Sequence, residues 1–265
     1  MRILLSILFI GFFLFTNGQP KISDKNIFEF RGVWVATVEN IDWPSKRGLS
    51  NEDQKKEFIA LLEMHKKNGM NAIVMQVRPS GDAMYPSTLE PWSEYLMGKQ
   101  GLPPSPFYDP LAFMIQETHN RGMEFHAWIN PYRAVFNVNR SSVAPSHITK
   151  IHPEWFLVYG DKKYFNPGLP EVWKHTNRVV RDLVARYDID AVHMDDYFYP
   201  YRIAGKEFPD QATYITSKRG LNKEDWRRSN CDTIIKQLNA TIRSANPSVQ
   251  FGISPFGVWR NKSVD

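Results

Sequence analysis

Short apolar runs alternate with amphipathic stretches along most of the chain. Five runs rich in β-branched and aromatic residues predict strands at 30–36, 71–77, 124–129, 190–194 and 249–254. The stretches between them have apolar residues at helical spacing and predict helices at 53–67, 111–120, 172–187 and 223–244. Because a helix between two strands returns the chain to the same end of a sheet, this alternation predicts parallel strands and an α/β fold.

Two α/β architectures fit this alternation, an open doubly wound sheet and a (β/α)8 TIM barrel. An open nucleotide-binding sheet carries a Gly-rich turn after an early strand, and neither GxGxxG nor GxxxxGK[ST] occurs here. Long loops dense in polar and aromatic residues follow the strands instead, as at 76–82 and 128–133. Barrel enzymes build their sites from such loops, so we expect the barrel. Only about the first five βα units precede residue 265, which predicts a barrel truncated at its C-terminal side.

The first residues have the pattern of an export signal. An apolar run from Ile3 to Phe15 follows Met1 and Arg2, and it is shorter than the roughly 20 apolar residues that span a bilayer. We expect a signal peptide at 1–18, a linker at 19–29 and the barrel part at 30–265. The protein is then exported to the periplasm or the cell exterior, with no stable membrane span after cleavage. An uncleaved anchor is the alternative.

Composition and charge exclude several classes of protein. A chain of 265 residues that is 42% hydrophobic and 23% charged is neither disordered, collagen-like nor a bundle of membrane helices. Its 33 Lys and Arg against 28 Asp and Glu give a net charge of +5 without a long basic block, so we expect no nucleic-acid partner. Cys231 is the only cysteine, which excludes an intrachain disulfide. We expect a monomer.

The candidate chemistry concentrates after the fourth predicted strand, where Asp195 and Asp196 end an apolar run. Parallel strands end at the face where ligands bind, and two adjacent carboxylates there repel unless a proton, a cation or a substrate compensates. His193 and Asp195 are two residues apart and share a face of the strand, whereas Asp196 points elsewhere. Asp195 is therefore our candidate for the working carboxylate. Alternatively, one aspartate caps a turn and the other pairs with an arginine.

Aromatic residues at the strand ends and in the following loops point to a sugar ligand. Their flat apolar faces and polar edges suit sugar rings, although strand propensity and core burial explain many aromatics equally well. A hydrogen-bonded core histidine is likewise the alternative role for His126. The residues that we expect to contact a polysaccharide are Trp34, Arg78, Asp82, His126, Trp128, Asn130, Tyr132, Arg133, His193, Tyr197, Tyr199 and Trp259.

Five motifs, in their order along the chain, resemble those of the family 10 glycosyl-hydrolase-like proteins. They are RGVWV from Arg31, QVRPSGDA from Gln76, HAWINPYR from His126, HMDDYFYP from His193 and ISPFGVWRN from Ile253. The resemblance implies a (β/α)8 barrel in an exported bacterial protein. It also implies activity like that of members that cleave glycan strands of peptidoglycan, notably strands stripped of stem peptides. The family is normally longer than this chain.

A looser similarity is to barrel glycosidases of the α-amylase type, whose fourth strand ends in an aspartate that is the nucleophile. The register places Asp195 at that position. Those enzymes have a glutamate as the acid after the fifth strand, where residues 253–256 contain no carboxyl group. Our candidate for the second carboxyl group is Asp196; the alternatives are Asp82, Glu39, Asp42 or a residue beyond 265.

The sequence therefore predicts a glycoside hydrolase with two carboxyl groups, one protonating the leaving oxygen and the other acting as nucleophile or as base on water. We expect no cofactor and no metal ion. One alternative is a metal-dependent polysaccharide hydrolase or deacetylase with His126, His193, Asp195 and Asp196 as ligands, although no HxH or HxxxH spacing occurs. The other is a glycan-binding barrel fragment without turnover.

Overall fold

The computed structural model describes residues 29–195 and 198–255. Met1–Phe30 and Arg31–Asp265 are separate units, and every described helix and strand belongs to the second. The predicted signal peptide at 1–18 and nearly all of the predicted linker at 19–29 lie outside the described residues. Within the part of the chain that the structure describes, we find no helix with the length and apolarity needed to cross a membrane.

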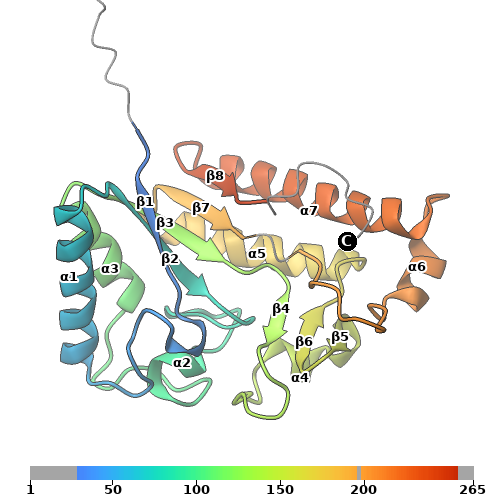
Figure 1. The fold of residues 1–265 in the computed structure, drawn as a ribbon, viewed down its shortest axis with the longest axis horizontal. Helices are drawn as coiled ribbons and strands as arrows, with labels where there is room; N and C mark the ends of the chain where they lie inside the picture. Colours follow the sequence, from blue (N-terminus) through green and yellow to red (C-terminus); the bar gives the residue numbers. More distant parts are fainter. Residues whose placement is uncertain (1–28, 196–197, 256–265) are drawn as a thin grey trace, which may run out of the picture. The chain divides into compact units, whose positions relative to one another are not determined.

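A five-stranded parallel sheet forms the centre of the second unit (Figure 1). The order is β1-β2-β3-β7-β8, and all four pairings are parallel. The strand bounds are β1 Gly32–Val35, β2 Ala72–Arg78, β3 Glu124–Ile129, β7 Ala191–Met194 and β8 Gln250–Ile253. Each strand coincides with a predicted one, so the expected α/β fold with a parallel sheet is confirmed.

Four longer helices connect the strands of this sheet. Their bounds are α1 Asn51–Lys67, α3 Pro110–His119, α5 Pro170–Arg186 and α7 Lys223–Ala245. Three of them begin where a polar side chain accepts a hydrogen bond from a first-turn amide: Ser50 before α1, Asp109 before α3 and Asn222 before α7. Because these side chains satisfy otherwise unpaired N–H groups, the helix starts are set locally by the sequence.

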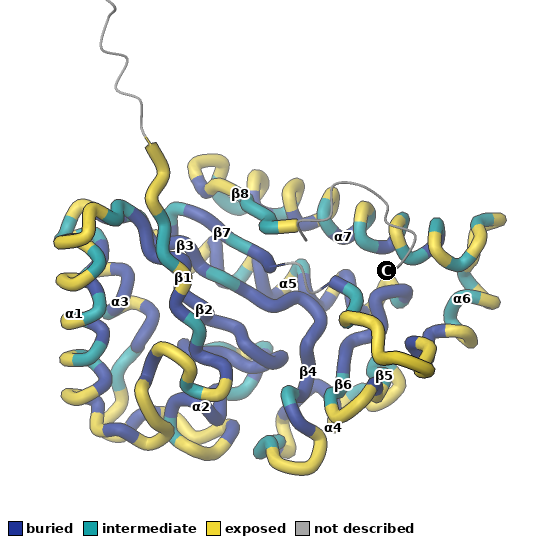
Figure 2. The backbone as a smooth tube through the Cα atoms, in the orientation of Figure 1, coloured by how far each residue is buried: buried dark blue, intermediate teal, exposed yellow. Residues whose placement is uncertain are grey.

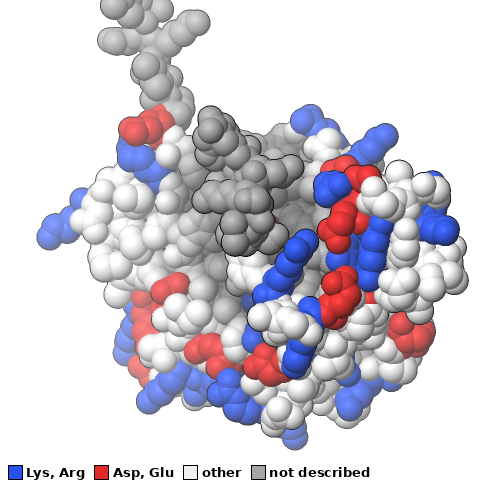
Figure 3. All heavy atoms as spheres, turned by 45° about the vertical axis from the view of Figure 1, so that its right-hand side comes forward, with Lys and Arg blue, Asp and Glu red and all other residues white. Residues whose placement is uncertain are grey.

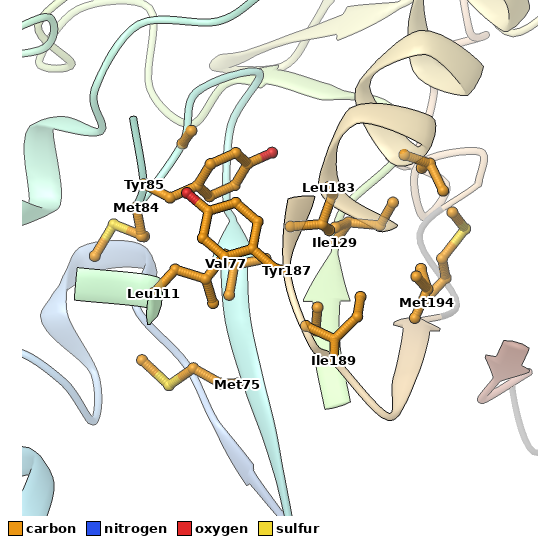
Figure 4. Close-up of a cluster of buried hydrophobic side chains, with 14 of the residues drawn as sticks. Met75, Val77, Met84, Tyr85, Leu111, Ile129, Leu183, Tyr187, Ile189 and Met194 are labelled. Atoms are coloured by element: carbon orange, nitrogen blue, oxygen red, sulfur yellow. The ribbon is translucent and has the colours of Figure 1, made fainter. Parts of the chain in front are cut away.

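The main core lies between the sheet and these helices. Alternate strand positions such as Met75, Ile129 and Met194 pack against helix residues such as Leu183 (Figure 4). The strands β2, β3 and β7 are buried along most of their length, whereas the edge strands β1 and β8 are only partly buried and the outward sides of α1 and α7 are exposed (Figure 2). The apolar side chains at alternate strand positions thus pack against the apolar side of each helix in one layer.

The other side of the sheet carries a different set of side chains, which we call the inner face. Trp34 of β1, Gln76 of β2, Trp128 of β3 and His193 of β7 belong to it. Trp34 is 38% exposed, so the described residues leave part of this face open to solvent. The inner face is therefore where a ligand can reach the sheet.

A second sheet lies between β3 and α5 in the sequence and was not predicted. It is antiparallel, in the order β4-β6-β5, with bounds β4 Arg133–Val135, β5 Phe156–Tyr159 and β6 Lys162–Phe165. Its strands have three or four residues, and only helices of three or four residues separate β4 from β5, so the alternation of strands with long helices did not indicate it. The remaining elements have three to seven residues: η1 Val38–Asn40, α2 Glu94–Met97, α4 Ile148–Ile151, η2 Pro153–Trp155 and α6 Gln211–Ser217.

Candidate active site

Asp195 lies at the carboxyl end of β7 and is 9% exposed. The indole Nε1 of Trp128 donates a hydrogen bond to its Oδ2 at 3.2 Å. The side-chain amide of Asn130 donates to both carboxylate oxygens, at 3.4 and 3.5 Å. Two donors from the end of β3 therefore orient the carboxyl group that the sequence selected first.

Asn130 is held so that its amide nitrogen faces Asp195. Its Oδ1 accepts hydrogen bonds from the backbone N–H of Arg133 at 2.7 Å and of Tyr132 at 3.3 Å. This is the turn that an Asn side chain forms with the residues after it. Because the turn fixes the position of the amide oxygen, it also fixes the direction of the NH₂ group, which donates to Asp195.

Arg78, the last residue of β2, is fully buried and belongs to a network of hydrogen bonds and ion pairs. Its Nε donates to Glu90 Oε2 at 2.6 Å, and its Nη1 donates to the backbone carbonyl of Asn130 at 2.5 Å. His175 Nε2 lies 3.1 Å from Glu90 Oε1. Burial by itself raises the pKa of Glu90, but the charge of Arg78 and the hydrogen bonds from His175 and Arg78 outweigh it and hold that pKa well below its ordinary value. Arg78 thus supports the site from inside rather than facing a ligand.

Three rings of the inner face lie against one another. Trp34 meets Trp128 edge to face at 4.7 Å between centroids, and His193 at 4.5 Å. His193 Nε2 is 3.0 Å from Ser254 Oγ, and burial together with nearby His126 lowers the pKa of His193 to about 4. The imidazole is therefore neutral at neutral pH. Together these side chains form an uncharged platform next to Asp195.

His126 lies on the inner face near His193 but is hydrogen-bonded to Glu124, and Asp82 is buried in the loop after β2. His126 is the third residue of β3, and its Nε2 is 2.9 Å from Glu124 Oε2, which matches the alternative of a hydrogen-bonded histidine. Asp82 is fully buried and accepts hydrogen bonds from Ser80 N and Gln100 Nε2, both at 3.0 Å. Burial raises the pKa of Asp82 to about 6, but the carboxyl group has no exposed surface through which to reach a substrate.

Tyr132 and Arg133 are also buried rather than presented at a surface. The Tyr132 ring belongs to the main core, 6.2 Å from the Phe198 ring. Arg133 is 7% exposed and donates through Nε to the backbone carbonyl of Pro79 at 2.9 Å. These positions favour the core alternative for Tyr132 and a loop-bracing role for Arg133.

Tyr199 lines a separate pocket of about 830 Å³ between the loop after β7 and α7. Its hydroxyl accepts a hydrogen bond from Asn230 at 3.2 Å, and its ring lies 5.6 Å from that of Phe208. Arg227, at this pocket, is ion-paired with Glu207 and Asp210. Figure 3 shows acidic and basic side chains intermixed on this face of the molecule. The structure thus places Tyr199 in a pocket whose lining includes none of the platform residues.

Three predicted site residues, Asp196, Tyr197 and Trp259, lie outside the described residues. Among the residues that are described, no three or more His, Cys, Asp or Glu side chains converge as metal ligands would. His126 and His193 make their hydrogen bonds to Glu124 and Ser254 instead.

Sequence reasoning missed Gln76, Glu90 and His175. Gln76 is fully buried on the inner face, and its Oε1 accepts hydrogen bonds from the backbone N–H of Thr37 and Val38. Alternation along β2 could have found it, because it shares the parity of Arg78. Glu90 and His175 come from a loop and from α5, 85 residues apart, and no local pattern connects them.

Two curated relatives named glycosyl hydrolases match most of this chain. The glycosyl hydrolase YngK of Bacillus subtilis is 54% identical over 240 residues, which cover 89% of this chain and 47% of that protein. The glycosyl hydrolase DigH of Escherichia coli is 38% identical over 265 residues, covering 93% of this chain and 59% of that protein. This chain therefore spans about half the length of the curated relatives that it matches.

Two solved structures share the fold at low sequence identity. The α-L-fucosidase isoenzyme 2 of Paenibacillus thiaminolyticus superposes with a TM-score of 0.55 at 14% identity, over 85% of this chain and 32% of that one. The α-galactosidase AgaA of Geobacillus stearothermophilus gives a TM-score of 0.51 at 13% identity, over 85% and 28%. The model of the Glycosyl hydrolase-like 10 family matches residues 29–265, and the chain belongs to that family.

Proposed function

We propose that this chain forms part of a glycoside hydrolase in which Asp195 is the working carboxylate. The observation that carries the proposal is the placement of Asp195 at the carboxyl end of a parallel strand, under the donors of Trp128 and Asn130. The aromatic platform beside it offers flat apolar surface to a sugar ring. The family and the names of the relatives support the same reaction class.

The sheet is proposed to be part of a (β/α)8 barrel. In such a barrel, helices cover the outside of the strands and the catalytic side chains gather at the carboxyl ends. The helices α1, α3, α5 and α7 pack on one side of the sheet, and the partly exposed inner face corresponds to the barrel interior. Further strands closing over that face would bury Trp34.

The proposed substrate is a bacterial cell-wall polysaccharide, with peptidoglycan glycan strands as the first candidate. Support comes from the family resemblance of the motifs and from the export pattern of residues 1–18, which favours export to the compartment of that polymer. The inner face adds an uncharged surface of Trp34, Trp128 and His193, which suits the apolar faces of sugar rings.

The proposed mechanism uses Asp195 and Asp196 as the two carboxyl groups, one protonating the leaving oxygen and the other attacking the anomeric carbon or activating water. Of the alternatives, Asp82 is sealed in the fold, and Glu39 is ion-paired with Arg47 at 3.3 Å. Asp42 Oδ2 accepts the backbone N–H of Ala36 at 2.7 Å. Asp82 is the one of the three without exposed surface; Glu39 and Asp42 are exposed, and these contacts already engage their carboxyl groups.

The test is digestion of glycan strands stripped of stem peptides by the wild-type protein and by Asp195→Asn, with products identified by mass. We expect the substitution to lower kcat by about 10³-fold or more, because the reaction loses its nucleophile or base. Asp190→Asn is the matched control. Asp190 lies at the amino end of the same strand, where its side chain accepts the N–H of Phe125, and the substitution is expected to leave cleavage intact. Cleavage by Asp195→Asn at the wild-type rate would refute the proposal.

The same assay tests the second carboxyl group. Asp196→Asn is expected to abolish cleavage, and Asp82→Asn to retain it. Release of acetate without shortening of the strands would instead support the deacetylase alternative. Strand binding without any product would support a glycan-binding protein.

A further inference from the structure

A line of buried hydrogen bonds connects α5 to Asp195. His175 on α5 contacts Glu90, and Glu90 accepts from Arg78 through both carboxylate oxygens. The Glu90 and Arg78 side chains have no exposed surface, and that of His175 is 5% exposed. The third guanidinium nitrogen of Arg78 is directed to Asn130. The line therefore ends at the residue whose amide orients Asp195.

Arg78 holds both sides of the Asn130 residue. Its Nη1 donates to the Asn130 carbonyl at 2.5 Å, and its own backbone carbonyl accepts the Asn130 N–H at 3.0 Å. The position of Asn130 therefore depends on the orientation of the Arg78 side chain. That orientation is set by the two parallel bonds to Glu90, because a bidentate carboxylate fixes the plane of a guanidinium group.

Aromatic rings confine the same network. Phe165 lies under the Arg78 guanidinium at 5.4 Å and stacks on the His175 ring at 5.8 Å with 22° between planes. A buried ion pair by itself contributes little net stability, because desolvation of both charges opposes their attraction. The fork geometry, the ring contacts and the bond to Asn130 are what an orienting device needs.

We propose that Glu90 is a positioning residue for Asp195: it orients Arg78, Arg78 fixes Asn130, and Asn130 orients the carboxylate. The inference rests on the proposed function, in which Asp195 performs the chemistry. Glu90 itself touches no substrate, because its side chain is completely buried.

The readout is the NMR signal of the Trp128 indole N–H, which donates to Asp195 and therefore follows its protonation. The signal is assigned by its loss in Trp128→Phe, and the titration is attributed to Asp195 by its loss in Asp195→Asn. On the neighbouring elements, the described charged or titratable side chains include Arg78 with its partner Glu90, Glu124, His126 and Arg133 on β3 and β4, and His193 on β7, and Asp196 is the next residue in the sequence. Because the pKa of His193 is lowered to about 4, the titration is repeated with His193→Asn.

Asn130→Ala sets the scale of the expected effect. It removes a donor from the ionised carboxylate and raises the Asp195 titration midpoint by about 0.5 to 1 pH unit. Glu90→Gln is expected to reproduce at least half of that rise and to add nothing further in the Asn130→Ala background, because both changes act through one amide. Glu90→Asp keeps the charge that Arg78 needs and shifts the fork by one methylene. It is expected to move the midpoint in the same direction, and it carries the test if Glu90→Gln does not fold.

Asp210→Asn is the matched control. Asp210 is also fully buried and ion-paired, to Arg227 and Lys223, but has no described contact with Arg78, Asn130 or Asp195. It is expected to leave the midpoint unchanged. The inference is overturned if the Glu90 variants keep the wild-type midpoint, or if their shift persists undiminished without the Asn130 amide.

Glycan cleavage by the same variants separates this inference from the proposed function. The Glu90 variants are expected to lower kcat about tenfold with little change in KM, since the substrate surface is untouched. A shifted midpoint in a protein that cleaves no glycan would refute the function and leave the positioning intact. Normal cleavage with an unshifted midpoint would refute the positioning alone.

Discussion

Buried carboxyl groups near the site differ in protonation because their partners differ. Glu90 faces a guanidinium group, and its pKa is held below the ordinary range. Asp82 is equally buried but accepts only from neutral donors, Ser80 N and Gln100 Nε2. Burial then prevails and raises its pKa to about 6. The partner, rather than the depth of burial, decides which state the fold holds.

Asp82 therefore predicts a pH dependence of stability. Between about pH 4, where an unfolded Asp titrates, and pH 6, the folded protein binds more protons than the unfolded chain. The contribution of Asp82 to the free energy of unfolding thus falls as pH rises through this window, by about 3 kcal/mol. Asp82→Asn lacks this loss, so the stability of the variant relative to wild type is expected to rise from pH 4 to pH 6.

Urea unfolding of both proteins at pH 4, 5, 6 and 7 measures this difference. His147 and His193, whose pKa values are lowered to about 4, give the opposite slope, but they are present in both proteins and cancel. Two stability curves that run parallel across the window would show that Asp82 is not the source.

At the scale of elements, the loop after β7 contacts the antiparallel sheet through the Tyr159 hydroxyl group and through the Phe208 ring, which packs against Tyr159 and Tyr164. Tyr159 of β5 accepts the N–H of Ile203 at 2.7 Å and donates to the carbonyl of Lys206 at 3.0 Å. Ile203 and Lys206 pair across a short turn, and residues 201–207 are exposed. This sheet, which the strand pattern did not reveal, thus braces the loop that follows the strand bearing Asp195.

Tyr159→Phe is expected to loosen the attachment of residues 201–207, because it removes the hydroxyl group that holds them. Loss of the two hydrogen bonds removes about 1 kcal/mol or more of local stability, which corresponds to roughly fivefold faster trypsin cleavage after Arg202 or Lys206. Cleavage sites identified by mass spectrometry provide the measurement. Tyr214→Phe is the control, since it removes only the bond from that hydroxyl to the carbonyl of Leu221. Equal cleavage rates in the two variants would contradict the bracing role.

At the scale of the whole unit, one core connects the sheet to helices far apart in the sequence. Leu183 of α5 is fully buried and lies near Ile129 of β3 and Ile189, which precedes β7 (Figure 4). The same cluster includes Phe58 of α1 and Ile234 of α7. A cavity at Leu183 is therefore expected to weaken residues 31–255 as one cooperative body.

Leu183→Ala is expected to lower the free energy of unfolding by about 2 to 5 kcal/mol. Far-UV circular dichroism and tryptophan fluorescence should report one coincident transition. Met64→Ala is the control, because Met64 on α1 is 52% exposed, and it should change the free energy of unfolding by less than about 0.5 kcal/mol. Two separated transitions would show that the antiparallel sheet unfolds independently.

The strand pattern led to the correct parallel strands because every strand of the large sheet has four or more residues and a helix of ten or more residues before the next one. The same pattern predicted that Asp195 lies at the carboxyl end of a strand, where parallel sheets bind ligands, and the structure has it there. Arg78, Tyr132 and Arg133 also lie at or after strand ends, but their side chains are buried in other contacts. Position along the chain indicates which end of the sheet a residue occupies, but not whether solvent reaches its side chain.

The sequence by itself determined the parallel α/β arrangement and the position of Asp195 at a strand end, because periodicity and strand ends are properties of neighbouring residues. Only the tertiary structure decided which side chains surround that carboxyl group. Glu90 meets His175 across 85 residues, and Arg78 meets Asn130 across 52. Such contacts depend on how strands and helices pack, and no local pattern carries that information.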